Sequence, residues 1–538
     1  MQKKDNRQQG ITRRDFIKGT TAATVALGIP FITRHADARP IKQELVIAWD
    51  ASGTAGWDFH KVTQKTQERG ASCTCYNSLI EFDRRKVDLN LLMPALASDW
   101  DISEDGLEWT FKLLEGVRWH DNYGVEWGEL TAEDIEYSIK RSLSFGGKQQ
   151  FSSVKDFKIL DKYTLKMMMQ TPQSQIDVMA MVAKTPQCFI ASKKAIEKLG
   201  DDFNLKPVGT GFFKLDKYVP NTYSEWIPHE RHWRGRPMLD RVRHMYMKDL
   251  SSREMAFQKG EAHMIQGLVS QRWYESASKL KDADPVLVGP GSIMVLHFNT
   301  SREPFKDKRL REAVMHAIDR ETLEKFIGKN ITRRQISPLH RDYMGYTEDV
   351  KRYDYNPDKV KELLEKAGSP KGFEVEMKIS EIDDYLTPMQ VVQGMLKKVG
   401  ITLKLNVVTH SAYHKLIRQD VNPLVIYGCD RFPTGQQLLE QFYHSKSIVG
   451  TPKAVTNFSH YNGIDKELDT ADTEVDVNKK IQLWQEAQKK IMEDAVAYPM
   501  YIYQRCWVKK KWVDLGYHFE SNLEYSPLLS EKTRILAH

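Results

Sequence analysis

The sequence has 538 residues, of which 41% are hydrophobic and 28% charged, and a formal net charge of +7. A chain of this length exceeds one compact core and predicts about three domains. The composition is typical of a folded soluble protein, and no apolar run reaches the roughly 18–20 residues that span a bilayer. Much of the positive charge lies in residues 1–38, and no basic stripe is evident elsewhere. We therefore expect no nucleic-acid partner.

Residues 1–38 have the features of an export signal in the expected order. The pair Arg13-Arg14 and the nearby Phe16 resemble a twin-arginine signal, and an uncharged, mildly apolar stretch follows over residues 19–33. Residues 36–38 form a small-x-small cleavage site. No Cys stands at this site, so we expect no lipid anchor. The alternative is a basic tail with a chance Arg pair, but the order of features favours export to the periplasm.

The five cysteines form an odd set, so at least one is unpaired. Twin-arginine signals mark proteins that fold before export, in a reducing compartment, and we expect no dependence on disulfides. Cys73 and Cys75 together with His60 offer soft metal ligands, but Cys-x-Cys alone is a weak signal. Buried, inert thiols are the favoured interpretation. We expect no metal site and no cofactor.

In the first half of the chain, the pattern predicts a few well-marked elements. Residues 45–49 are an apolar run typical of a buried strand, and residues 109–113 alternate as a strand does. Thr131 precedes acidic residues and is expected to cap a helix. The apolar side chains of that helix fall four residues apart, on one face.

The second half carries the clearest periodicity. A strand over residues 373–379, a helix opened by Thr387-Pro388, and a strand over residues 401–407 form a βαβ unit. This unit predicts an α/β fold with some parallel strand pairing. Asn356 before Pro357 is expected to cap another helix, and Asp307 to cap the helix that follows it. The helix after Asp307 is expected over residues 308–318 and the helix after Asn356 over residues 357–368. A further amphipathic helix is expected over residues 481–495.

Many short motifs, taken in order, resemble the peptide/nickel class of ABC solute-binding proteins. The resemblance covers about residues 43–515. The motifs occupy residues 76–83, 93–100, 106–111, 116–121, 130–135, 207–213, 233–237, 298–300, 304–307, 317–320 and 363–368. Their number and order make the resemblance more specific than any single motif would be.

The resemblance implies the α/β, two-lobed periplasmic binding protein fold (class II, Venus-flytrap) with an extra small domain on the first lobe. In this sequence, the first lobe would comprise residues 39–75, 206–295 and 500–538. The extra domain would cover residues 76–205 and the second lobe residues 296–499.

The resemblance also implies a function. A monomer, not embedded in the membrane, would capture a peptide or similar small organic solute between its lobes. It would deliver this ligand to an inner-membrane ABC permease with cytosolic ATPases. The alternatives are a binder of a metal chelate or a sugar, or a periplasmic sensor, chaperone or enzyme on the same scaffold.

One candidate ligand contact lies in the second lobe. In peptide-binding relatives, an Asp in a Trp-x-x-Asp-Tyr-x-x-Pro-like segment holds the α-amine of the ligand, and Asp430 stands at that position here. A desolvated carboxylate facing an ammonium is a strong, oriented contact. The segment lacks the usual Trp, and Arg431 and Phe432 follow the Asp. Arg431 either pairs with Asp430 or meets an anionic ligand group. The alternative is a surface ion pair worth about 0–1 kcal/mol.

Further candidates lie in the first lobe. The loop after its first strand often lines the cleft in this family, which implicates Trp57, His60 and Val62. Trp57 either stacks on a ligand face or fills the lobe. Tyr76, near the start of the extra domain, has the same two interpretations.

Local catalytic motifs are missing. Gly209-Thr-Gly211 and Gly289-Pro-Gly291 lack the third glycine of a dinucleotide loop. His229 and His232 are one residue short of the zinc-protease spacing. No Gly-x-Ser-x-Gly elbow occurs. We therefore expect a binding protein and not an enzyme.

Overall fold

The computed structural model describes residues 41–61, 66–83, 92–148, 150–183, 186–429, 433–450, 456–519 and 526–537. Residues Lys42–His538 form one compact unit, separate from Met1–Ile41. The predicted export signal lies outside the described residues. Within the described part of the chain, no helix has both the length and the apolar character needed to cross a membrane.

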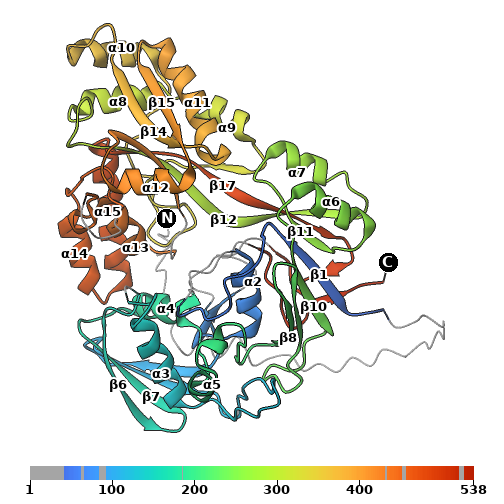
Figure 1. Ribbon diagram of the computed structural model, residues 1–538. Helices are drawn as coiled ribbons and strands as arrows, with labels where there is room; N and C mark the ends of the chain where they lie inside the picture. The colour runs from blue at the N-terminus through green and yellow to red at the C-terminus, as the bar shows by residue number, and fades with distance from the viewer. Residues whose placement is uncertain are drawn as a thin grey trace, which may run out of the picture. The chain divides into compact units, whose positions relative to one another are not determined.

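A mixed nine-stranded sheet is the largest element of the fold (Figure 1). Its order is β16-β12-β17-β11-β1-β10-β9-β8, and β13 pairs with β17. β1 runs parallel to β10 and β11, whereas the other pairs are antiparallel. The strands are β1 (Glu44–Trp49), β8 (Phe213–Val219), β9 (Tyr223–Pro228), β10 (Arg241–Tyr246), β11 (Met264–Gln266), β12 (Ala283–Phe298), β13 (Thr332–Arg334), β16 (Leu424–Cys429) and β17 (Ala497–Lys510).

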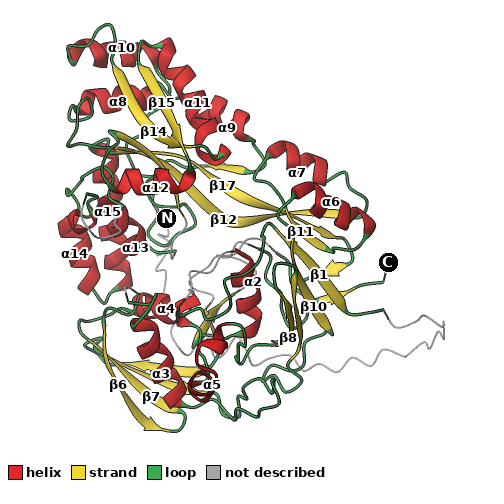
Figure 2. Ribbon diagram, in the orientation of Figure 1, coloured by secondary structure: helices red, strands yellow, loops and turns green. Residues whose placement is uncertain are grey.

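A four-stranded antiparallel sheet forms a second unit of structure, and α3 lies against it (Figure 2). Thr131 and Asp134 form a capping box at the start of α3, which confirms the predicted helix start. The sheet order is β4-β5-β7-β6, from β4 (Ala97–Ile102), β5 (Glu108–Leu113), β6 (Val154–Asp161) and β7 (Thr164–Met169). Nearby elements are α2 (Thr66–Cys75), β2 (Ile80–Phe82), β3 (Leu92–Pro94), α3 (Ala132–Leu143), α4 (Gln175–Ala183), α5 (Lys193–Leu199) and the short helices Pro186–Cys188 and Gly200–Asn204.

The second half of the chain contains the predicted βαβ unit. β14 (Glu374–Ser380) pairs in parallel with β15 (Thr402–Val408), and α11 (Asp383–Lys398) connects them. The helix was predicted to open at Thr387-Pro388, and this was wrong: α11 begins at Asp383 and contains Pro388. Two acidic residues in the first turn favour the earlier start, because they complement the positive end of the helix dipole.

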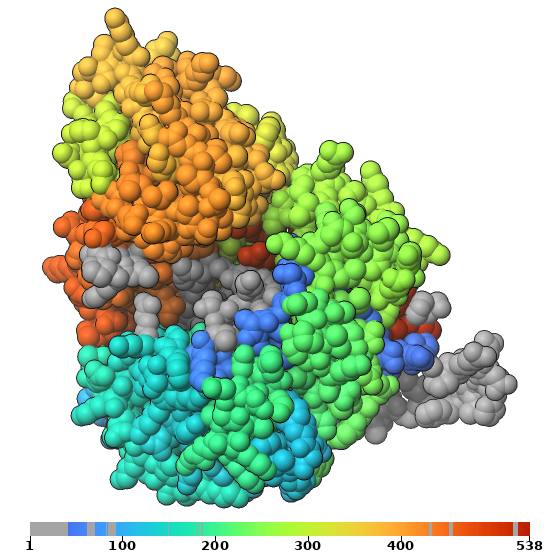
Figure 3. All heavy atoms as spheres, in the orientation of Figure 1, coloured from blue at the N-terminus to red at the C-terminus, as the bar shows by residue number. Residues whose placement is uncertain are grey.

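The remaining helices surround the sheets. Asp307 caps α8, and Asn356 caps α10 with Pro357 at the first helical position, as predicted. Residues 300–420, coloured yellow-green to orange, lie together on the molecular surface at the top of Figure 3. These and the remaining elements are α6 (Leu250–Lys259), α7 (Gln271–Ala277), α8 (Lys308–His316), α9 (Arg320–Ile327), α10 (Pro357–Lys366), α12 (His410–Arg418), α13 (Gly435–Tyr443), a short helix (Ser445–Ser447), α14 (Asp465–Thr473), α15 (Val477–Glu493), β18 (Val513–Asp514) and β19 (Arg534–Ile535).

Buried apolar side chains gather in two large cores. The first core draws on residues between Leu45 and Tyr246, on Met264 and Val288, and on Trp507 and beyond. The second core draws almost entirely on residues between Ile293 and Tyr503. A smaller third cluster, which includes Ala283 and Cys506, lies under α6 and α7. Separate cores are the physical basis of the two lobes of this fold.

Candidate functional site

β12 and β17 connect the two large cores. They pair along almost their whole length, from Ala283 opposite Lys510 to His297 opposite Ala497. Along β12, Val288 packs in the first core and Ile293 in the second, and β17 makes the return crossing. The lobes are therefore joined by a pair of hydrogen-bonded strands, and a bend in this pair changes how the lobes face each other.

The pairing of β12 with β17 is interrupted between Val288 and Ser292. This bulge, residues 289–291, we call the hinge. Gly291 has a φ of +93°, and a Cβ atom there would lie 2.3 Å from the carbonyl oxygen of Tyr503. Only glycine combines this conformation with so close an approach of the partner strand. Bulges bend strands and release ladder hydrogen bonds, so the paired strands β12 and β17 are expected to bend most easily at this position.

β16 ends beside the hinge. Its last residue, Cys429, lies opposite Ile293, just after the bulge. Farther along the chain, Pro433 accepts a hydrogen bond from the Met344 amide at 2.8 Å, and Gly435 donates to the Met344 carbonyl at 3.0 Å. The predicted contacts Asp430, Arg431 and Phe432 lie outside the described residues. Cys429, directly before this segment, lies at the hinge end of the sheet.

Aromatic and basic side chains surround this end of β16, and we call them the β16 cluster: Tyr385, His410, His414, Arg418 and Tyr427. The Gly428 amide donates to the Tyr385 hydroxyl at 3.4 Å, and Arg418 donates to the Tyr427 hydroxyl at 3.3 Å. The ring of Tyr385 lies 5.5 Å from that of His410, and the ring of His414 lies 5.7 Å from that of Tyr427. Such side chains combine apolar faces with polar tips, which suits an organic ligand.

Charged groups stand close to this cluster on α11 and on β17. Burial raises the pKa of Asp384, on α11, and the charge of Arg505, on β17, opposes that rise. Burial also raises the pKa of Tyr501, and Tyr503 and Asp384 add to the effect. Tyr501, Tyr503 and Arg505 alternate along β17 and so share one face of it. Sequence reasoning missed them, although polar tips at every second position of an apolar strand were a usable signal.

The first-lobe candidates occupy a different environment. Trp57, His60 and Tyr76 are each 1% exposed. The ring of Trp57 meets the rings of Tyr218 and Trp226 edge-on at 5.4 and 5.3 Å. In this structure these side chains fill the first core. Val62 lies outside the described residues.

A buried ion pair anchors the same loop to α3. Asp58 accepts two hydrogen bonds from Arg141, at 2.8 and 2.6 Å, and their side chains are 2% and 10% exposed. The Nδ1 atom of His60 lies 2.8 Å from the same guanidinium. Burial first, and the charge of Arg141 second, lower the pKa of His60 to about 3. A neutral imidazole therefore accepts from the guanidinium through Nδ1, while its buried Nε2 atom has no hydrogen-bond partner among the described residues.

Cys75 and Cys506 are free thiols in this structure, and burial raises the pKa of both. These thiols are poor nucleophiles at neutral pH. Among the described residues, no three His, Cys, Asp or Glu side chains come together as a metal cage.

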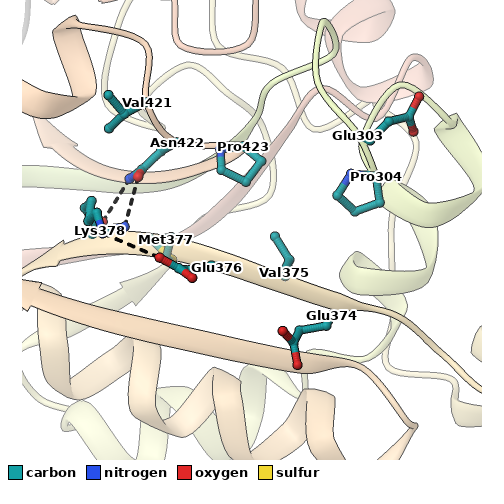
Figure 4. A pocket seen from close by; sticks show the side chains of 10 residues that line it. All are labelled: Glu303, Pro304, Glu374, Val375, Glu376, Met377, Lys378, Val421, Asn422 and Pro423. Carbon is teal, nitrogen blue, oxygen red and sulfur yellow. Dashed lines mark hydrogen bonds and ion pairs between the residues drawn. The ribbon is translucent and has the colours of Figure 1, made fainter.

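A separate pocket lies at the free edge of β14 (Figure 4). It has a volume of about 330 Å³ and is lined by Glu374–Lys378, Val421–Pro423, Glu303 and Pro304. The Asn422 side chain accepts from the Lys378 amide at 2.9 Å and donates to its carbonyl at 2.8 Å. The Asn422 side chain thus makes the two hydrogen bonds that a residue of a neighbouring strand would make with Lys378, at one end of the free edge of β14. None of the predicted site residues lines this pocket.

Comparison with known proteins decides the family. A model of the bacterial extracellular solute-binding proteins, family 5 (middle), matches residues 92–450. The chain belongs to this family. Its resemblance to the peptide/nickel class of ABC solute-binding proteins is therefore confirmed, and so is the two-lobed fold.

Individual relatives cover most of this family 5 protein. The dipeptide-binding protein of Escherichia coli K12 is 24% identical over 507 residues, which are 88% of this chain and 91% of the relative. Heme-binding protein A of Haemophilus influenzae is 24% identical over 74% of this chain and 76% of its own. Among solved structures, MoaA of A. tumefaciens R10, in complex with mannopinic acid, is 30% identical. It covers 92% of this chain and 100% of its own, with a TM-score of 0.77.

Proposed function

We propose that this solute-binding protein captures a peptide or a similar small organic solute in the periplasm and delivers it to an ABC permease. The observation that carries the proposal is the hinge: a glycine bulge in paired crossing strands, beside the end of β16 and its cluster of polar and aromatic side chains. A ligand held by one lobe stabilises the closed form through contacts with the other. Catalysis has no role in this proposal.

The lobes of this proposal follow the domain boundaries expected from the sequence. The first lobe comprises residues 39–75, 206–295 and 500–538, with an extra domain over residues 76–205, and the second lobe comprises residues 296–499. The first crossing supports its boundary, because Val288 and Ile293 pack in different cores. On the return crossing, Tyr503 packs in the second core and Trp507 in the first, which favours a boundary between these two residues.

A buried contact between α4 and α15 supports closure between the extra domain and the second lobe. Lys480 on α15 has a fully buried side chain and lies 2.6 Å from a carboxylate oxygen of Asp177 on α4. Ile176, also on α4, packs in the second core. A buried charge needs its partner, so this pair favours the arrangement in which the two helices meet.

The ligand contacts proposed from the sequence are Asp430, Arg431 and Phe432 in the second lobe. Their place in the sequence directly after β16 supports them, because the last residue of β16, Cys429, lies beside the hinge. Trp57, His60, Val62 and Tyr76 remain proposals for the first lobe. The mannopinic acid in MoaA favours testing amino-acid conjugates beside peptides.

Two measurements test this function. Short peptides and amino-acid conjugates are screened by thermal shift, where a ligand at 100 times its Kd adds about 2.7 kcal/mol to the free energy of unfolding. X-ray scattering of the purified protein then compares the radius of gyration with and without the stabilising compound. A ligand that stabilises and compacts the protein supports the proposal. If compounds stabilise the protein but none of them lowers its radius of gyration, the proposed closure of the lobes is contradicted.

Export is tested separately. We propose the twin-arginine signal in residues 1–38 as the route to the periplasm. Arg13→Lys together with Arg14→Lys is expected to retain the protein in the cytoplasm, measured by fractionation. Unchanged periplasmic recovery would remove this route while leaving ligand binding untouched.

A further inference from the structure

Two histidines of the β16 cluster face one another on α12. His410 and His414 are four residues apart, and such residues lie on the same face of a helix. Their Nε2 atoms are 3.0 Å apart and their ring centroids 4.4 Å apart. Both side chains are partly exposed, so a small cation can reach them from solvent.

We propose that His410 and His414 bind a divalent late transition metal ion, Ni²⁺, Cu²⁺ or Zn²⁺, through their Nε2 atoms. With metal–nitrogen bonds of about 2.0–2.1 Å, two ligands at square or tetrahedral angles stand about 2.9–3.4 Å apart. The observed separation of 3.0 Å falls in this range before any movement. Imidazole suits all three metals. The other coordination positions are open to water or to donor atoms of a bound solute.

Hydrogen bonds to Ser380 fix the orientation of the His410 ring. Nδ1 of His410 lies 2.9 Å from the Ser380 hydroxyl oxygen, which also accepts from the Ile382 amide at 3.2 Å. When Nδ1–H of His410 donates to Ser380, Nε2 presents its lone pair toward His414. A partner on the outer nitrogen is what fixes the tautomer and the ring orientation of a metal-binding histidine.

Without metal, one proton between the two Nε2 atoms satisfies the pair, with His414 donating to His410. The metal ion takes the place of that proton. Metal binding needs the unprotonated Nε2 of each imidazole. Glu381, near His410, adds a negative charge that favours a cation.

Arg418 opposes the metal. Its Nη1 lies 3.4 Å from Nδ1 of His414 and also donates to the His414 carbonyl oxygen at 2.9 Å. In the metal-bound tautomer Nδ1 of His414 carries a hydrogen, so the guanidinium has to turn away, and its charge repels the ion. Arg418→Gln should therefore bind metal several-fold more tightly than the wild-type protein. No purely structural role for the histidines makes this prediction.

The test uses the purified protein without a histidine tag, stripped with a chelator and titrated calorimetrically with each metal salt alone. We expect one ion per chain, and an affinity at least about tenfold weaker in His410→Gln and in His414→Gln. His316→Gln on α8 is the matched control and should bind as the wild type does. Equal binding by wild type and the His410→Gln/His414→Gln double variant would overturn the proposal.

A measurement on the unaltered protein guards against misfolded variants. The electron paramagnetic resonance spectrum of one equivalent of Cu²⁺ should show coupling to two imidazole nitrogens, and a spectrum without nitrogen coupling would contradict the site. The proposal does not depend on the organic ligand. If thermal stabilisation by peptides persists in the double variant while stabilisation by metal is lost, the two sites are separate in function.

Discussion

The first-lobe loop, which the sequence marked for ligand contact, and the β16 cluster, which it did not, differ in how their polar groups are used. In the first-lobe loop, Asp58 and His60 are bound to Arg141, and Trp57 is enclosed by other rings. At the end of β16, His410 and His414 lie within hydrogen-bonding distance of one another and are partly exposed, whereas Tyr385 and Tyr427 are buried. The first-lobe loop is thus buried around an ion pair, whereas the histidine pair on α12 is within reach of solvent.

The largest expected effect on stability concerns the buried Asp58–Arg141 pair of the first-lobe loop. Asp58→Ala leaves Arg141 as a buried, unpaired charge, so we expect the free energy of unfolding to fall by about 3–5 kcal/mol. Urea denaturation measures this loss. The control is Lys61→Ala in the same loop, because the Lys61–Asp201 pair is exposed (36% and 99%) and should contribute less than about 1 kcal/mol. Similar losses for both variants would mean that the loop is not anchored by its buried pair.

The second prediction concerns the hinge beside the β16 cluster. Gly291→Ala combines a strained left-handed conformation with a clash against the Tyr503 carbonyl, and should cost about 2–4 kcal/mol. Gly116→Ala is the control: its φ is +75° but a Cβ there meets nothing within 4 Å, so about 1–2 kcal/mol is expected. Thermal denaturation compares the two. Equal costs would show that the close approach of the crossing strands does not constrain the hinge.

Local chemistry explains what the sequence predicted well. Thr131 with Asp134, and Asn356 with Pro357, mark helix starts because each cap needs only neighbouring residues. The family motifs likewise predicted the two-lobed fold and its solute-binding role. The burial of Trp57 could not be predicted in the same way, since it depends on Tyr218 and Trp226, which are far along the chain.

The candidate site was predictable only in part. The family pattern predicts contacts at residues 430–432, and this stays a prediction; the residue before them, Cys429, lies beside the hinge. The β16 cluster was missed because its members come from three separate elements, α11, α12 and β16. Only the folded sheet brings Tyr385 to the Gly428 amide. Tertiary convergence of this kind leaves no mark in local sequence.

The third prediction uses pH to examine the loop. The pKa of His60 is lowered to about 3 in the folded protein, against an ordinary value near 6.5 when unfolded. Below pH 6.5 the unfolded chain therefore binds a proton that the folded chain does not, and stability falls as pH falls. From pH 6.5 to 4.5 this costs about 2 kcal/mol. His60→Asn should lose correspondingly less stability over this range in urea titrations, and an unchanged slope would mean that His60 is solvated.

The smallest expected effect on stability distinguishes the two regions most directly. Tyr427→Phe removes the hydroxyl that accepts from Arg418, which should cost about 0.5–1.5 kcal/mol. Tyr427 is itself buried, but its donor Arg418 is partly exposed, so affinity for the organic ligand should fall several-fold in calorimetric titrations. Tyr413→Phe is the matched control, since its buried hydroxyl donates to the Ile426 carbonyl at 2.5 Å within the second core. It should lower stability by a similar amount while leaving affinity unchanged. If instead both variants keep full affinity, the ligand does not reach the β16 cluster, and the accessible polar groups there serve another purpose.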